Sequence, residues 1–215
     1  MPPHYLPAVP RPALLTTALA LLVTLPLAGQ QSPVPQPPVP TASLVGQPVA
    51  VVPMTLVAID PAIGSDTLFR ALGDRRATLS WADSLIGDAL VGRAPEVKWV
   101  LPPRLRKVAR RAPGLVDDPD AMGQAMLRSP RLKEVPDPLR ASLRNLMAVV
   151  GGRVAFVPAA VGFTRDTTGI RAELSLVAAD TRSGRILWRS VPVGTGPTPA
   201  AALGAALAAV LPLDQ

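Results

Sequence analysis

The sequence contains no cysteine, only one histidine, and few aromatic residues, which make up 3% of its 215 residues. Without cysteine the chain has no disulfide, no thiolate nucleophile and no Cys-ligated zinc or iron–sulfur site. The single histidine, His4, cannot form a multi-histidine metal cage. It lies in an N-terminal segment that we expect to be cleaved, so the mature chain would have no histidine to act as a base. We therefore expect no catalytic, metal-binding or cofactor-binding residues and predict that the protein is not an enzyme.

The N-terminus is polar up to Arg11 and then apolar from residue 13 to 27. A run of about 15 apolar residues is short for a membrane span, and Pro26 ends it. We predict a signal peptide over residues 1–29 and a periplasmic or secreted mature chain without a transmembrane span; a retained anchor is the alternative. The end of the run resembles the lipobox of bacterial lipoproteins, but Gln30 stands where the lipid-bearing cysteine would be.

Proline is concentrated after this segment. Residues 30–48 read QQSPVPQPPVPTASLVGQP and contain no charged residue. Such a composition favours an extended, polyproline-like chain, so we predict a linker over 30–48. A docking ligand for a proline-binding domain is the less favoured interpretation. No comparable break follows, and we predict a single domain over 49–213.

The first part of this domain alternates between strand and helix patterns. Residues 49–57 (VAVVPMTLV) are typical of a buried strand, and residues 97–101 predict a second strand. Between them, Asp74 can cap an amphipathic helix that continues to Leu90. A strand, a helix and a strand in this order indicate a parallel crossover unit.

The rest of the domain consists of a helical insert followed by strands. Residues 102–150 predict short helices rich in basic residues, with Gly151 at the end of the last one. Three β-rich runs then follow, joined by polar glycine turns, at 154–164, 170–179 and 185–193. An alanine-rich helix over 198–211 closes the chain. The predicted fold is α/β, with a mixed sheet that ends in a three-strand antiparallel meander, helices packed on it, and a basic helical insert over 102–150.

The last hairpin carries a resemblance to known proteins. The segment Asp180-Thr181-Arg182-Ser183-Gly184, followed by Trp188, resembles the D-x-x-T-G-x-x-x-W hairpin of a group of bacterial envelope proteins, and residues 49–54 resemble the opening strand of that group. The group comprises the curli-secretion lipoproteins, the lipoprotein activators of penicillin-binding proteins and the amino-terminal domain of the Tol–Pal translocation protein. The resemblance implies a non-catalytic envelope domain that binds protein partners or self-associates. The insert at 102–150 departs from the shared pattern.

The insert also carries the densest group of positive charges in a chain of net charge +7. We consider six residues as candidate contacts for a partner or a polyanion: Arg104, Arg106, Lys107, Arg110, Arg111 and Trp81. A solvated helix face is the simplest interpretation, and contact with anionic lipid or wall polymers comes next. Aromatic residues are not interleaved with the cluster, so we expect no nucleic-acid partner. Trp81 is expected to be exposed and Trp188 to be buried.

Two other patterns partly match known binding motifs. Asp117, Asp118 and Asp120 form the only dense carboxylate group, which lacks the later glycine and glutamate of a calcium loop, so we interpret it as turn and cap residues. Residues 194–196 (Gly-Thr-Gly) lack the third glycine of a dinucleotide loop, and we predict a loop there.

We therefore predict an exported, envelope-associated binding or assembly module that contacts envelope proteins or itself. A carboxylate-dependent hydrolase of wall or surface polymers is the first alternative. Polyanion binding through the basic helix is the second alternative.

Overall fold

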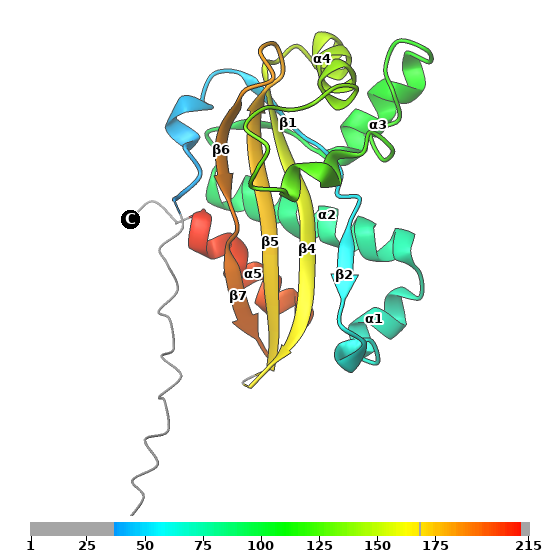
Figure 1. Ribbon diagram of the computed structural model, residues 1–215, viewed down its shortest axis with the longest axis vertical. Helices are drawn as coiled ribbons and strands as arrows, with labels where there is room; N and C mark the ends of the chain where they lie inside the picture. The colour runs from blue at the N-terminus through cyan, green and yellow to red at the C-terminus, as the bar shows by residue number, and fades with distance from the viewer. Residues whose placement is uncertain (1–36, 168, 212–215) are drawn as a thin grey trace, which may run out of the picture. The chain divides into compact units, whose positions relative to one another are not determined.

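The computed structural model describes residues 37–167 and 169–211, which form a mixed seven-stranded sheet with helices on both faces (Figure 1). The strands are β1 (Pro48–Val51), β2 (Val57–Ile59), β3 (Lys98–Val100), β4 (Val154–Asp166), β5 (Gly169–Asp180), β6 (Ile186–Ser190) and β7 (Val193–Gly196). The helices are α1 (Thr67–Leu72), α2 (Arg75–Arg93), α3 (Pro102–Arg111), α4 (Leu139–Val150) and α5 (Pro199–Val210), with 3₁₀ turns η1 (Thr41–Ser43), η2 (Pro61–Ile63) and η3 (Gln124–Arg128). The predicted α/β class is confirmed.

The sheet is built around the two long strands β4 and β5. The main order is β3-β1-β4-β5-β6, while β2 also pairs with β4 and β7 also pairs with β5. Strands β1, β2 and β3 run parallel to their partners, and β4 to β7 pair in antiparallel fashion. The parallel crossover through α2 and the C-terminal antiparallel meander are therefore both present.

Two strands that we predicted as continuous are broken in two. The predicted strand over 49–57 divides between β1 and β2, and the predicted strand over 185–193 divides between β6 and the first residue of β7. Proline has no backbone N–H to donate to a ladder, and Pro53 and Pro192 each lie between the two pieces. The second break also corrects the loop predicted for the Gly-Thr-Gly segment, because residues 193–196 form β7 and pair with residues 170–173 of β5.

The two faces of the sheet bury separate hydrophobic cores. We call the face covered by α1, α2 and α5 the rear face, since α2 and α5 lie behind the strands in Figure 1, and the face covered by α3, η3 and α4 the front face. In β5 the side chains of Ala172, Leu174 and Leu176 point to the rear core, as the alternation in the sequence predicted. Val177 and Ala179 point to the front core. The insert at 102–150 therefore supplies the helical layer that covers part of the front face.

Helix ends follow the local signals. Asp74 accepts a hydrogen bond from the Ala77 N–H at 2.7 Å and caps α2, and Thr198 caps α5 through the Ala201 N–H at 3.2 Å. Gly151, with φ at +87°, ends α4. The short helix α1, which we did not predict, is capped by Asp66.

The segment before Val49 lies against the domain. Val39 and Leu44 are 5% and 1% exposed and belong to the rear core. The Val39 N–H donates to the Val210 carbonyl at 2.8 Å, and the Trp188 indole donates to the Pro37 carbonyl at 3.3 Å. Two apolar side chains of the predicted linker are thus part of the core. The boundary between linker and domain therefore lies N-terminal to the expected residue 49. The predicted signal peptide and residues 30–36 lie outside the described residues.

Candidate binding surface

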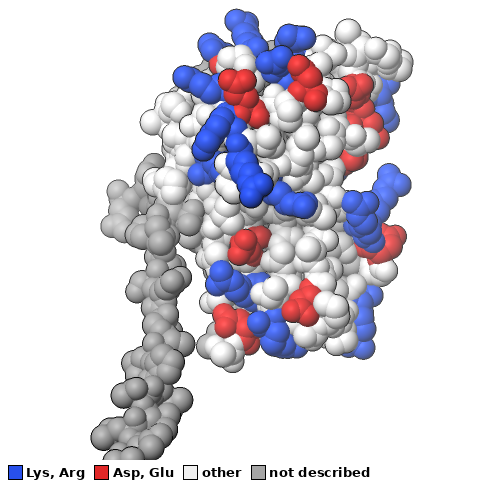
Figure 2. All heavy atoms as spheres, viewed as in Figure 1, with Lys and Arg blue, Asp and Glu red and all other residues white. Residues whose placement is uncertain are grey.

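The surface of the basic helix α3 carries the candidate site. Four of its cations are exposed and make no ion pair with any residue that the structure describes: Arg104, Lys107, Arg110 and Arg111. Figure 2 shows most of the basic side chains in that view over the upper half of the molecule, where α3 and α4 lie, with several acidic side chains among them. The helix begins at Pro102, and Leu105 is its fully buried anchor in the front core.

The fifth cation of α3 points inward. Arg106 binds the buried carboxylate of Asp83 on α2 at 2.7 Å and the carboxylate of Asp120 at 2.7 Å. Asp83 also accepts the Met54 N–H at 2.8 Å, and its side chain is 5% exposed. Burial raises the pKa of Asp83, against the lowering effect of the hydrogen bonds from Met54 and Arg106. The hydrogen bond to Asp120 is the main cause that raises the pKa of Arg106.

These contacts lie at the gap where β1 has ended and β2 has not begun. Gln124 of η3, fully buried, donates through Nε2 to the carbonyls of Pro53 at 2.7 Å and Pro119 at 2.8 Å. We call the four polar side chains around Pro53 and Met54 the polar tie: Asp83, Arg106, Asp120 and Gln124. It joins α2 of the rear layer to α3 and η3 of the front layer. Because Arg106 is held inward, the opposite side of α3 faces solvent.

The exposed side of α3 is hollowed. A shallow depression of about 500 Å³ is lined by five residues: Pro103, Arg104, Lys107, Val108 and Arg111. Its polar groups are three cations, and no carboxylate, histidine or hydroxyl lines it. Such a surface can attract and hold an anionic group.

Trp81 does not join this surface. It lies on α2 and is half-buried on the rear side, with ring centroids 6.3 Å from Phe69 and 6.0 Å from Phe163. The expectation of an exposed aromatic is corrected, because α1 and the far end of β4 bring Phe69 and Phe163 to a helix position that borders polar residues in the sequence. Trp81 and the basic cluster lie in different layers of the fold.

The three neighbouring aspartates have separate structural partners. Asp117 accepts from the Ser142 hydroxyl at 2.5 Å, Asp118 accepts from the Asp120 N–H at 3.0 Å, and Asp120 binds Arg106. The helix cap that we considered for them is absent, since η3 begins after Gly123 without a side-chain cap. Across residues 37–167 and 169–211 no group of three or more acidic, histidine or cysteine side chains is placed to hold a metal ion.

The hairpin that carries the resemblance has a structural role. One oxygen of Asp180 accepts the N–H groups of Arg182 and Ser183 at 2.9 and 3.3 Å, and the other accepts Arg153 Nε at 2.8 Å. The hydrogen bond from Arg153 is the main reason that the pKa of Asp180 falls to about 2. Trp188, as predicted, is buried, and it stacks on Phe156 at 6.1 Å.

The fold is an α/β domain, and α3 gives it a cationic surface. The sequence matches no protein-family model and no curated protein. Three solved structures are similar to the chain, each 12% identical in sequence. The LpoB C-terminal domain from Salmonella enterica has a TM-score of 0.38 and covers 71% of this chain and 84% of its own.

The other two are lipoprotein GNA1162 from Neisseria meningitidis and a PelC dodecamer from Paraburkholderia phytofirmans. The former has a TM-score of 0.35 and covers 71% of this chain and 82% of its own. The latter has a TM-score of 0.36 and covers 83% of this chain and 94% of its own. With identities and TM-scores this low, the three structures are similar to the chain but give no information about its function. Within the part of the chain that the structure describes, no helix is long and apolar enough to cross a membrane.

Proposed function

We propose that the chain is an exported, non-catalytic binding or assembly module of the bacterial envelope that contacts an acidic partner protein through α3. The observation that carries the proposal is that the basic residues of this helix have two different environments. Arg106 is bound inward by two carboxylates, whereas the four other cations remain exposed without ion pairs among the described residues. The predicted signal peptide supports export, and the resemblance of the hairpin supports the envelope as the site of action.

The charge of the front layer supports the same surface. Residues 102–150 contain ten basic and five acidic residues, a balance of +5 in a chain whose net charge is +7. Rigid attachment of α3 through the polar tie keeps its exposed cations in a fixed pattern, which favours recognition of a complementary acidic surface. Anionic lipid headgroups or wall polymers could bind the same cations through charge alone, and this polyanion binding is the second candidate function.

The test compares two variants of equal net charge. The α3 variant carries Arg104→Gln, Lys107→Gln, Arg110→Gln and Arg111→Gln, and the control variant carries Arg70→Gln, Lys98→Gln, Arg131→Gln and Arg182→Gln, all of which are exposed positions. Both proteins are produced in a bacterial periplasm and crosslinked in intact cells, and the captured proteins are identified. We expect the amount of crosslinked envelope partner to fall at least tenfold in the α3 variant and to stay unchanged in the control variant. Equal loss in both variants, or none in either, contradicts the proposal.

A second measurement separates a protein partner from a polyanion. Cosedimentation with vesicles of 30% phosphatidylglycerol in phosphatidylcholine, compared with neutral vesicles, measures attraction to anionic lipid. Binding to a specific partner should be abolished in the α3 variant and remain when the vesicles are absent. Binding to anionic vesicles that falls steeply with salt, without any crosslinked protein, would favour the polyanion function instead.

A further inference from the structure

Strand β2 leaves one edge of the sheet unpaired. It pairs only with β4. The Leu56 carbonyl accepts the Val161 N–H at 3.1 Å, and the Asp60 N–H donates to the Phe163 carbonyl at 2.9 Å. Because backbone direction alternates along a strand, residues 55, 57 and 59 direct their backbone groups away from β4. The Thr55 carbonyl accepts Arg75 Nη2 at 2.6 Å. The backbone N–H and C=O groups of Val57 and Ile59 make no hydrogen bond with the residues described.

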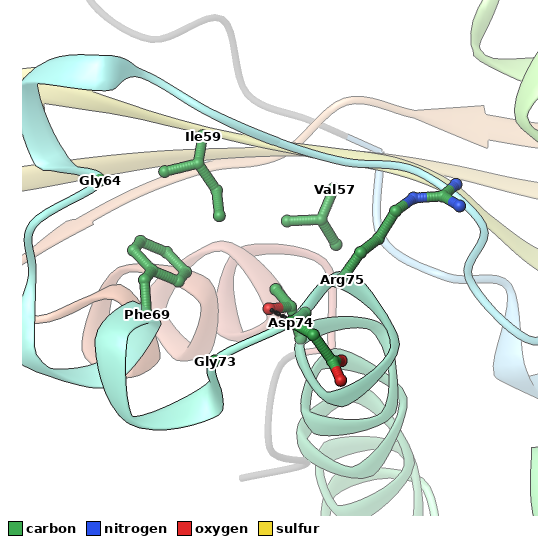
Figure 3. Close-up of a pocket in the computed structure, with 8 residues that line it drawn as sticks. Val57, Ile59, Gly64, Phe69, Gly73, Asp74 and Arg75 are labelled. Carbon is green, nitrogen blue, oxygen red and sulfur yellow. Dashed lines mark hydrogen bonds between the residues drawn. The ribbon is translucent and has the colours of Figure 1, made fainter.

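A pocket of about 380 Å³ opens beside this edge on the rear face. Its apolar walls are Val57 and Ile59 of β2 and Phe69 of α1, and Thr78 with the first residues of α2 line its other side. Figure 3 shows Val57 and Ile59 pointing from the strand toward Phe69, with Gly64 and Gly73 at the rim. Trp81 and Phe163 pack against Phe69 and hold this wall in place.

The edge and the pocket together match one kind of occupant. An extended segment added along β2 would satisfy the free backbone groups, and every second side chain of that segment would point to the rear face. An apolar side chain at such a position would enter the pocket. Strand edges in monomeric domains are usually blunted by charge, proline or a covering element. Strand β2 is short, with three residues, and along its edge only the Thr55 carbonyl is covered, by Arg75.

The charges at the rim favour an acidic neighbour for that side chain. Helix α2 has 19 residues, begins beside the pocket, and carries Arg75 and Arg76 but no acidic residue in its first turn. The positive end of the helix dipole adds to these charges. Asp74 also lines the pocket, and its carboxylate is held by the Ala77 N–H as the helix cap.

We propose that the β2 edge binds an extended segment of a partner protein as an added strand, with one apolar side chain in the pocket and an acidic residue near Arg75. This site lies on another part of the molecule from the α3 surface and does not depend on it. Its affinity comes from main-chain hydrogen bonds and its specificity from the pocket.

The probe for the test is an acetylated nine-residue peptide with Val, Leu and Val at alternate positions, Thr between them and two Glu residues at one end. Binding is followed by amide chemical shifts of the isotope-labelled domain. We expect saturable binding below 1 mM, with the largest shifts at Val57, Ile59 and the Trp81 indole N–H. N-methylation of the peptide amides that face β2 should abolish binding, whereas N-methylation of the other amides should not. Absence of binding at 1 mM, or equal effects of the two methylation patterns, overturns the proposal.

A matched pair of glycine variants tests the pocket. A Cβ at Gly64 would meet nothing closer than the Pro61 carbonyl at 3.6 Å, and one at Gly92 on α2 would meet nothing within 4 Å. Gly64 lines the pocket. We expect Gly64→Leu to obstruct the pocket and weaken peptide binding at least tenfold, while Gly92→Leu should leave the affinity unchanged. Replacing the peptide's Glu residues with Lys should weaken binding at least threefold. Equal affinities within either comparison contradict the proposed occupant. The α3 variant should bind the peptide normally, so this proposal and the proposed function fail separately.

Discussion

The two faces of the sheet are built differently. All six aromatic residues within the described ranges belong to the rear core or pack against it: Phe69, Trp81, Trp99, Phe156, Phe163 and Trp188. The front core contains only aliphatic and methionine side chains, such as Leu105, Leu143 and Met147, beneath a basic helical layer. The rear face thus holds the bulky side chains with specific ring geometry, and the front face supplies the charged surface.

The faces also differ in how completely they are covered. Helix α5 lies so close to β7 that a Cβ on Gly194 would be 2.2 Å from both the Ala202 carbonyl oxygen and the Ala206 nitrogen. On the front face, a Cβ on Gly162 of β4 would meet nothing within 4 Å. A hollow of about 580 Å³ lies there over small and polar residues including Ala58, Thr164 and Ser175. Close backbone packing therefore characterises the rear face at a place where the front face is bare.

The largest expected effect tests this difference with one substitution on each face. Gly194→Ala forces a methyl group into the backbone of α5 and should lower the free energy of unfolding by at least about 4 kcal/mol. Gly162→Ala should change it by no more than about 0.5 kcal/mol. Urea unfolding followed by circular dichroism measures both. Similar effects for the two variants would show that the faces are equally open or equally closed.

The next effect concerns the polar tie between the two layers. Asp83→Ala removes the acceptor for the Met54 N–H and one partner of Arg106, and should lower the free energy of unfolding by about 3 kcal/mol. Arg104→Ala, on the exposed side of the same helix α3 that bears Arg106, should change it by less than about 0.5 kcal/mol. If both variants were equally mild in urea unfolding, Arg106 would be a surface residue like its neighbours.

The smallest expected effect concerns Asp180, in the hairpin that joins β5 to β6. The pKa of Asp180 is lowered in the folded state, so its ionised form stabilises the fold above the unfolded pKa of about 4, and this stabilisation is lost as the pH falls toward about 2. Asp180→Asn should therefore cost about 2 kcal/mol at neutral pH.

The measurement is urea unfolding at several pH values between 7 and 2.5. The difference between wild type and Asp180→Asn should shrink steadily below about pH 4. Asp88→Asn, an exposed position on α2, should differ from wild type by less than about 0.5 kcal/mol at neutral pH. A difference between wild type and Asp180→Asn that does not depend on pH would mean that the ionised carboxylate contributes nothing through Arg153.

Features set by neighbouring residues were predictable. The cap at Asp74, the stop at Gly151 and the alternation along residues 170–176 depend on a few adjacent positions, and the structure has all of them. The strand breaks at Pro53 and Pro192 had a local signal that we did not use, whereas the failed prediction for Trp81 depended on distant partners. Trp81 looked exposed because its neighbours on the helix are polar, and only the approach of Phe163, 82 positions later in the chain, makes it part of the rear core.

The candidate site shows the same division. Five basic residues on α3 and the start of the helix at Pro102 could be identified from the pattern alone. Nothing in that pattern distinguishes Arg106 from the other cations, because its partners Asp83 and Asp120 lie on other elements and meet it only at the gap between β1 and β2. The pocket beside β2 could not be predicted either, since its walls come from a strand, a short helix and the first turn of α2.

The sequence by itself therefore determined the α/β class, the ends of the main helices and the limits on catalytic chemistry, since these follow from composition and local hydrogen bonding. Tertiary structure decided the division of two predicted strands, the folding of residues 37–48 onto the rear core, and the inward turn of Arg106. The last two features arise from long-range packing, in which a buried charge or an apolar side chain is stabilised only by the partner that the fold brings to it. The strand division has a local contribution as well, because Pro53 and Pro192 lie between the pieces.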